Sequence, residues 1–511
     1  MDLLTNLAYG FQVVLTWNML MFCFIGVALG TFVGVLPGIG AFSALAMLLP
    51  ITFHFEPAAG LIMLAGFYYG ALYGGSTASI LLNMPGTPSA AITCLEGYPM
   101  TQKGRAGVAL TMTAVASFFG GTFSFLLIAL LALPLARVAT SFGAPEYTSM
   151  LVLGLVVCST VTGGSIARGL AMMAFGLILG VVGLDLASAE ARYTFGQVSL
   201  LDGVSLVALA MGLLGVPEIL FRLSDADEGA RAPVGYGGFR ALMPTWPDIR
   251  DSIMPMFRGS TIGALLGILP GTGATIASFL SYAAERSIAR DKSTFGTGRI
   301  EGLTSPEAAN NSAAQSAFIP TLTLGIPGDP VMALMIGALM IHGIQPGPLM
   351  LRDHADVFWG LIASFWIGNL MLLVLNIPFV GLWVRLLRIP YRLLYPGILV
   401  FVCLGVYSVR NNVADLIVLM AAAALACVLR MLRLSPIPLL LGFVLGTMLE
   451  QNMRRALMIS SGDAMIFLTR PISLGFLVAS ALFAVLIAMG IRRQNMAARR
   501  EPEIATEGRN A

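Results

Sequence analysis

Long apolar runs, separated by charged or Pro/Gly-rich breaks, dominate the pattern along the chain. Residues 11–35, 108–133 and 361–384 are examples. They approach or exceed the ~20 residues with which an α-helix spans a bilayer core. A membrane β-barrel would instead show polar and apolar residues alternating in segments of ~10, and no such alternation is seen. The pattern predicts an all-α polytopic membrane protein.

The predicted helices fall into two series. The first lies near residues 11–35, 58–82, 107–133, 146–165, 169–187 and 203–221, and the second near 259–284, 308–326, 330–344, 357–383, 395–409, 413–429, 436–450 and 471–491. Several are too short to cross a membrane alone, so we expect roughly 10–12 crossings, including broken or re-entrant helices.

A polar segment divides the two series. Residues 222–258 are rich in Asp, Glu, Gly and Pro, which predicts a surface linker between a first transmembrane half, 1–221, and a second half, 259–491. Residues 492–511 form a basic tail. The positive-inside rule predicts that this tail and the basic loop 285–301 are cytoplasmic.

Two motifs occur in the same order in both halves. Residues 36–40 read LPGIG and residues 269–273 read LPGTG, while NMPGTP at 83–88 corresponds to GIPGDP at 325–330. This repetition indicates an internal duplication. The pattern fits parallel or inverted halves, and inversion is the expectation because it is common in secondary transporters.

Composition and charge narrow the class of protein. Of the 511 residues, 57% are hydrophobic and 11% charged, against about a quarter charged in soluble domains. The net charge of +3 comes from scattered basic residues and gives no basis for nucleic-acid binding. The five cysteines stand apart and are interpreted as packing residues.

The Pro-Gly motifs are the candidate chemistry. Proline removes a backbone donor and glycine permits unusual backbone angles, so each motif should interrupt a helix at membrane depth. Non-helical backbone there is tolerated only around protein or a watery cavity. A helix N-terminus suits a carboxylate and a C-terminus suits a cation, so an anion site with a Na+ or H+ site nearby is expected.

Small polar residues around these breaks are the predicted ligands. Hydroxyl and amide groups can orient a carboxylate or coordinate a desolvated sodium ion. The predicted substrate-binding residues are Gly38, Gly40, Ser43, Ser76, Thr77, Asn83, Gly86, Thr87, Gly271, Thr272, Gly273, Thr275, Asn310, Asn311 and Gly328, and the predicted coupling-ion residues are Ser79, Thr323 and Asp329. Helix packing is the alternative for the Gly-x-x-x-Gly row of Gly26, Gly30 and Gly34 and for any single hydroxyl, and a solvated helix cap is the alternative for Asp329.

These motifs resemble those of one family, the large transmembrane subunit of tripartite tricarboxylate transporters. The likeness rests on residues 34–40, 69–76 with 83–88, 267–273, and 310–311 with 325–330, and length and hydropathy agree over nearly the whole chain. The resemblance implies a small four-helix membrane subunit and a periplasmic solute-binding protein as partners.

It further implies import of organic tricarboxylates or dicarboxylates across the bacterial inner membrane, driven by a Na+ or H+ gradient and not by an enzyme reaction. The chain has no G-x-x-x-x-G-K-[ST] motif, which agrees with gradient-driven transport, and neither a resident metal nor a cofactor is predicted.

Two other functions fit parts of the pattern. A channel or a structural membrane scaffold could also use broken helices. An intramembrane aspartyl protease would need two facing carboxylates, and neither Asp185 nor Asp415 has a motif comparable with that of Asp329.

Overall fold

The computed structural model is almost entirely helical, which confirms the all-α prediction. It describes residues 3–36, 41–139, 142–158, 166–185, 190–217, 220, 239–269, 273–347, 349–386 and 391–485. Five of the described helices are long and apolar enough to span a membrane: α2 (Trp17–Val35), α4 (Pro57–Leu82), α6 (Ala106–Ala139), α17 (Ala355–Asn376) and α20 (Val413–Met431). The chain is therefore a multi-pass membrane protein.

The first of two compact units combines residues 1–140 with 204–428. Besides the spans above, it contains α1 (Leu3–Val14), α3 (Ala41–Thr52), η1 (Pro88–Ala90), α5 (Ala91–Gln102), α9 (Leu206–Ala210), the π-helix η3 (Met211–Gly215), η4 (Phe239–Leu242), α11 (Trp246–Ile268), α12 (Gly273–Ile288), η5 (Lys292–Thr294), α13 (Ile300–Ser316), α14 (Phe318–Leu324), α15 (Pro330–Ile341), α16 (Met350–Asp353), α18 (Val380–Leu386) and α19 (Tyr391–Arg410). The helix α11 begins within the segment that the sequence assigns to a linker.

The second unit combines residues 141–203 with 429–511. Its described elements are α7 (Ala144–Cys158), α8 (Ile166–Gly180), η2 (Val198–Leu200), α21 (Ile437–Ile459), α22 (Ile466–Thr469) and a hairpin of two-residue strands, β1 (Gly183–Leu184) and β2 (Ala191–Arg192). Helix α21 packs against α7 and α8. The units do not follow the sequence halves, because the second takes residues from both.

In the first unit, α2 and α4 pack backbone against backbone. A Cβ atom added to Gly30 would lie 2.1 Å from the carbonyl oxygen of Phe67. Gly26 and Gly34, one turn before and after, face α4 in the same way. Glycine at every fourth position therefore lets the two helices approach more closely than any side chain would allow.

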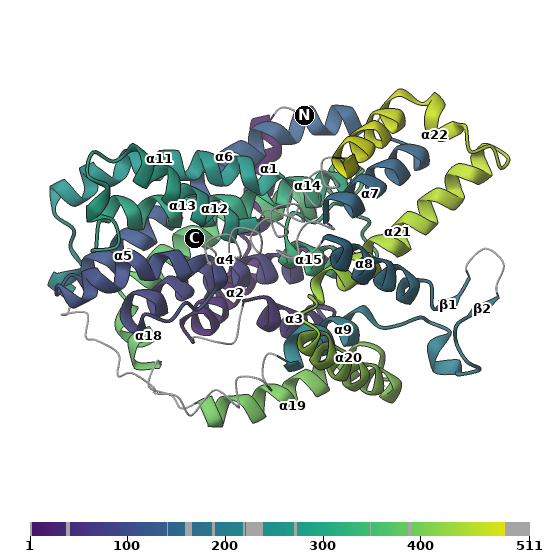
Figure 1. The fold of residues 1–511 in the computed structure, drawn as a ribbon, viewed down its shortest axis with the longest axis horizontal. Coiled ribbons are helices and arrows are strands. Elements are labelled where there is room, and N and C mark those ends of the chain that lie inside the picture. Colours follow the sequence, from purple (N-terminus) through teal and green to yellow (C-terminus); the bar gives the residue numbers. More distant parts are fainter. Residues whose placement is uncertain are drawn as a thin grey trace, which may run out of the picture. The chain divides into compact units, whose positions relative to one another are not determined.

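The pair α11 and α13 repeats this packing. A Cβ atom added to Gly263 would lie 2.3 Å from the carbonyl oxygen of Ala309, and Gly259 and Gly267 face α13 in the same way. These glycines lie at the sequence offset that relates LPGIG to LPGTG. Figure 1 shows α11, α12 and α13 side by side. The duplicated motifs thus sit on duplicated helix pairs.

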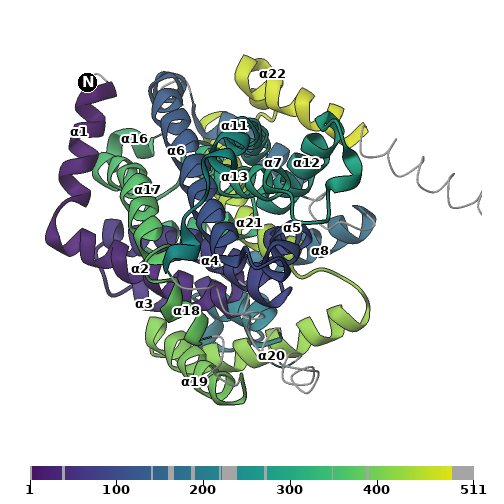
Figure 2. The same ribbon diagram turned by 90° about the vertical axis from the view of Figure 1, so that its left-hand side faces the viewer.

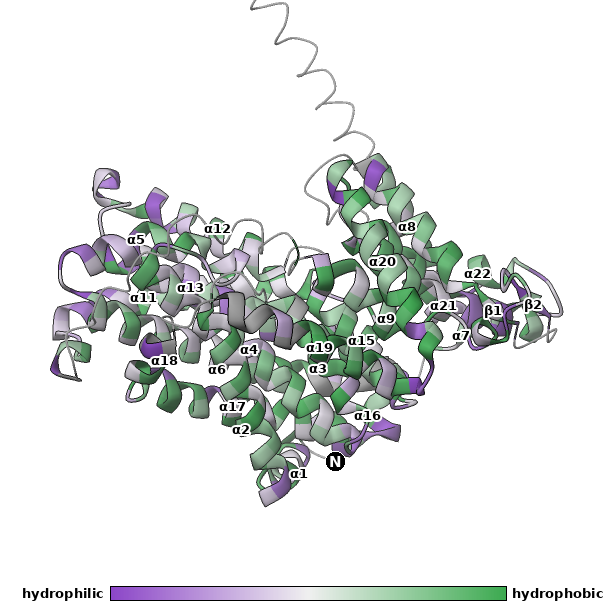
Figure 3. Ribbon diagram, turned by 90° about the horizontal axis from the view of Figure 1, so that it is seen from below, coloured by the Kyte–Doolittle hydropathy of each residue, from purple (hydrophilic) through white to green (hydrophobic). Residues whose placement is uncertain are grey.

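Helix α4 lies at the centre of the first unit. It contacts α2, α5, α6 and α17, which surround it in Figure 2. Its whole apolar window is buried inside the protein. Hydrophilic residues gather at helix ends and in connecting loops, whereas α2, α3 and α17 are mostly hydrophobic (Figure 3). Polar side chains on α4 therefore have to find partners within the protein.

The start of α11 is fixed by an acidic cap. The backbone N–H of Thr245 donates to Asp248 at 3.0 Å, and Arg105 pairs with the same carboxylate at 2.6 Å. Partial burial opposes ionisation of Asp248, but the hydrogen bonds from Arg105 and Thr245 outweigh it and lower its pKa. The carboxylate thus ties α11 to the residue that precedes α6.

Candidate functional site

Two of the four Pro-Gly motifs lie within the described residues, at 83–88 and 325–330, and each interrupts a helix. Residues 37–40 and 270–272, which make up most of LPGIG and LPGTG, lie outside the described residues. Helix α4 ends at Asn83, whose φ of 57° is left-handed, and η1 begins at Pro88. In the second repeat α14 ends at Gly325, with φ 68°, and α15 begins at Pro330. A left-handed residue ends one helix, and proline, which lacks an N–H, begins the next. The local sequence therefore accounts for the end of each helix and for the start of the next one.

The break in the first repeat lies directly against the glycine row of α2. A Cβ atom added to Gly86 would be 2.2 Å from the carbonyl oxygen of Gly34 and 2.6 Å from Cα of Gly75. The equivalent Gly328 lies against Ala317, with Cβ atoms 2.8 Å apart. The glycine of each Pro-Gly pair is therefore required for close packing.

Asp329 is the buried carboxylate of the second break. The residue is only 6% exposed. Its carboxylate accepts a 2.7 Å hydrogen bond from the hydroxyl of Tyr68, and it caps α15 by accepting a 2.9 Å hydrogen bond from the N–H of Met332. Gly273, with φ 62°, begins α12 and lies beside the Asp329 side chain. The LPGTG and GIPGDP motifs of the second repeat are thus brought together in space.

A second buried carboxylate, Glu307, was missed by sequence reasoning. Ser76 donates to both of its oxygens at 2.8 Å, Ser117 donates at 2.9 Å and Thr93 at 3.1 Å. Residue Asn311 also contacts it, at 3.4 Å. One signal was available in the sequence, because Glu307 is the one charged residue between positions 302 and 328.

Other predicted ligands have local partners. Ser79 donates to the carbonyls of Gly75 and Ala90, and Thr323 donates to that of Ile319. These hydroxyls and Asp329 therefore bond to different groups, and their role as coupling-ion ligands stays a prediction.

The remaining predicted substrate ligands differ in their surroundings. Thr87 shares a 3.1 Å hydrogen bond with Ser89, Thr77 is buried, Thr275 is partly buried and Asn83 is exposed. Gly38, Gly40, Gly271 and Thr272, and the side chain of Ser43, lie outside the described residues.

Unpartnered amides accompany the hydroxyls on α13. Within the described part of the chain, neither side-chain polar atom of Asn310 or Gln315 has a hydrogen-bond partner, nor has Oδ1 of Asn311. All three residues are at most 1% exposed. Buried polar groups are normally hydrogen-bonded, so unpartnered amides in a helix of this unit point to a missing ligand or water.

A different carboxylate anchors the polar loop after α12. Glu96 is fully buried and accepts hydrogen bonds from the backbone N–H groups of Gly296, Gly298 and Arg299 at 2.6–2.8 Å, and from the hydroxyl of Tyr282 at 2.8 Å. Successive backbone N–H groups form an anion-binding site, and here the carboxylate of Glu96 occupies it. Its role is structural.

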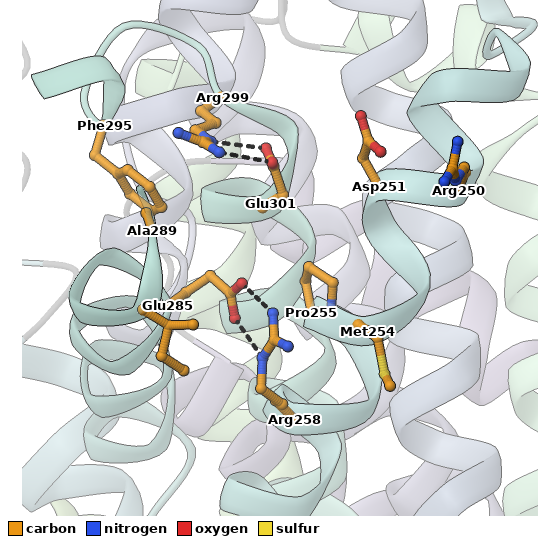
Figure 4. Close-up of a pocket in the computed structure, with 11 residues that line it drawn as sticks. Arg250, Asp251, Met254, Pro255, Arg258, Glu285, Ala289, Phe295, Arg299 and Glu301 are labelled. Carbon is orange, nitrogen blue, oxygen red and sulfur yellow. Dashed lines mark hydrogen bonds and ion pairs between the residues drawn. The ribbon is translucent and has the colours of Figure 1, made fainter. Parts of the chain in front are cut away.

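A pocket of about 290 Å³ lies beside this loop. Arg258 pairs with Glu285, and Arg299 pairs with both oxygens of Glu301 at 3.0 Å (Figure 4). The hydrogen bond with Glu301 raises the pKa of Arg299. Carboxylates therefore neutralise two of the arginines that line the pocket.

The architecture defines a class of protein. Repeated helix breaks inside a multi-pass helical unit are typical of membrane transporters.

Comparison with known proteins identifies the family. The family model described as the tripartite tricarboxylate transporter TctA family matches residues 20–441, so the chain belongs to this family. This confirms the resemblance in the motifs. The family is the large component of tripartite transporters and is not enzymatic, so the chain is a membrane transporter component.

Two relatives from Agrobacterium vitis are similar over long stretches. An uncharacterised 52.8 kDa protein in the TAR-I ttuC′ 3′ region is 50% identical over 489 residues, which cover 96% of this chain and 97% of the relative. An uncharacterised protein in the TAR-II ttuC′ 3′ region is 50% identical over 227 residues, 44% of this chain and 93% of the relative. No solved structure matches the chain.

Proposed function

We propose that the chain is the large subunit of a binding-protein-dependent secondary transporter that imports organic tricarboxylates or dicarboxylates by symport with Na+ or H+. One observation carries this proposal: Pro-Gly motifs end helices at corresponding positions of the two repeats in the first unit, and the buried Asp329 of the second break lies beside Tyr68 of α4 and Gly273 of LPGTG. Membership of the tripartite family supports the same function.

The carboxylate substrate is proposed to bind along the breaks and α13. When NMPGTP at 83–88 is aligned with GIPGDP at 325–330, Tyr68 of the first repeat corresponds to Asn310 of the second, and Thr87 corresponds to Asp329. The second-repeat break thus carries a negative charge, whereas the first-repeat break carries a hydroxyl. An anionic substrate is favoured near Thr87 and the unpartnered Asn310 amide, away from the Asp329 carboxylate.

The proposed transport cycle is alternating access. Joint binding of carboxylate and cation would allow the inward transition, because neither charge then has to cross the apolar interior alone. A small four-helix membrane subunit and a periplasmic solute-binding protein are the proposed partners, and the bacterial inner membrane is the proposed location. Loading by the binding protein would give the transport its direction.

The test is uptake by vesicles that contain this chain and its candidate partner subunits. A panel of tricarboxylates and dicarboxylates is offered under separate Na+ and H+ gradients. We expect saturable uptake of at least one carboxylate that stops when the driving gradient is collapsed. Uptake that persists without any cation gradient would contradict symport, and flux that does not saturate would indicate a channel.

A further inference from the structure

The cage around the buried carboxylate of Glu307 is built from side chains of four helices. Its donors, Ser76, Thr93 and Ser117, come from α4, α5 and α6, while Glu307 lies on α13. Glu307 itself is 1% exposed. One carboxylate thus joins helices of both repeats inside the first unit.

No basic side chain neutralises this carboxylate within the part of the chain that the structure describes. Asp248 has Arg105 and Glu285 has Arg258, whereas every contact of Glu307 is a neutral hydroxyl or amide. Burying an ion without a counter-charge is strongly unfavourable, and neutral donors recover part of the loss. A cation bound beside an ionised Glu307 would therefore be favoured.

A small cavity and two unpartnered amide oxygens lie close to Glu307. A cavity of about 10 Å³ is lined by Ser76, Ser117, Glu307 and Asn376, among others. Within the described residues, Oδ1 of Asn376, which lines this cavity, is buried and has no hydrogen-bond partner. The same holds for Oδ1 of Asn311, whose amide contacts Glu307 but does not line the cavity. A space of roughly 10–15 Å³ holds one water molecule, so the cavity excludes a hydrated ion.

We propose that Glu307, with the hydroxyls of Ser76, Thr93 and Ser117 and the amide oxygen of Asn311, binds one desolvated sodium ion. The ligand set consists of oxygens only, as hard cations require, and its single negative charge matches a monovalent ion. To present Oδ1, the Asn311 amide turns about its last torsion, which exchanges its nitrogen and oxygen. A bare sodium ion is smaller than the water molecule that the cavity could hold.

The site is distinct from the predicted ion residues Ser79, Thr323 and Asp329. Because Ser76 lies on α4 before the first break and Glu307 lies on α13 of the second repeat, a bound ion would hold the two repeats together. The role of the ion in transport rests on the proposed function. Binding of the ion does not rest on that function and can be measured without substrate or partners.

The experiment is calorimetric titration of the purified full-length chain with NaCl, in choline chloride at constant ionic strength, together with its unfolding temperature. We expect saturable Na+ binding and Na+-dependent stabilisation in the natural protein. Glu307→Gln should abolish both, whereas Glu96→Gln, which alters an equally buried carboxylate, should retain binding. Ser117→Ala should weaken binding by roughly 10-fold, as loss of an ordering contact does at metal sites, and serves if Glu307→Gln does not fold.

Several results would overturn the site. These are absent Na+ binding in the natural protein, binding that survives in Glu307→Gln, and equal loss in Glu96→Gln or Asp329→Asn. Stability that depends on pH but not on Na+ would assign a proton to Glu307 instead of sodium. If the protein binds Na+ through Glu307 but vesicles take up no carboxylate, the site stands and the proposed function fails. If vesicles take up carboxylate but the protein binds no Na+, the transport function stands and the sodium site fails.

Discussion

Replacing Gly30 with alanine tests the close packing of α2 against α4. The added methyl carbon would lie 2.1 Å from the Phe67 carbonyl oxygen, whereas real Cβ contacts are essentially never shorter than 3.0 Å. The helices must therefore separate locally by about 0.9 Å, the difference between these distances. Backbone flanks the site, so no flexible side chain can absorb the change.

The expected loss of stability follows from two opposing effects. Overpacking of this kind costs about 3 kcal/mol, the upper end of its usual range. Replacing a helical glycine with alanine contributes about 1 kcal/mol in the opposite direction. We expect a net destabilisation of about 2 kcal/mol, seen as a lower thermal unfolding temperature of the detergent-solubilised protein. Gly263→Ala should act in the same direction, because the second repeat has the same packing.

Gly475→Ala is the matched control for this prediction. Gly475 lies in the apolar helix Pro471–Val485, and no heavy atom lies within 4 Å of its added Cβ. Its substitution should leave the unfolding temperature unchanged or slightly higher. Equal unfolding temperatures for Gly30→Ala and Gly475→Ala would refute the proposed contact between α2 and α4.

Three further predictions concern carboxylates. Tyr68→Phe removes a donor from Asp329 and should destabilise the protein by about 1.5–3 kcal/mol, whereas Tyr69→Phe, which loses an unpartnered hydroxyl, should be near neutral in the same unfolding assay. Glu96→Gln should speed proteolysis of the loop whose backbone it binds, and an unchanged cleavage rate would argue against this anchor. Folding lowers the pKa of Asp248, so the ionised carboxylate stabilises the folded protein above pH 3.8, its ordinary pKa, and this stabilisation is lost in more acidic solution. Asp248→Asn should therefore lower the unfolding temperature at pH 7, and the difference from the natural protein should shrink below pH 3.8.

The sequence by itself determined the class of fold and the positions of the breaks. Apolar length predicts membrane helices, and proline with glycine acts on the backbone of its own segment, so residues 83–88 and 325–330 could be identified without tertiary information. Duplication was visible for the same reason. The motifs that carry the family resemblance are also contiguous in the chain.

Tertiary structure decided which polar groups meet. Ser76 and Glu307 are 231 residues apart in the chain, and Tyr68 and Asp329 are 261 residues apart, so local pattern could not pair them. The sequence drew attention to Asp329 through its motif and passed over Glu307, which lies in the middle of a helix. A carboxylate becomes chemically unusual through burial and through its missing counter-charge, and both are properties of the packed fold.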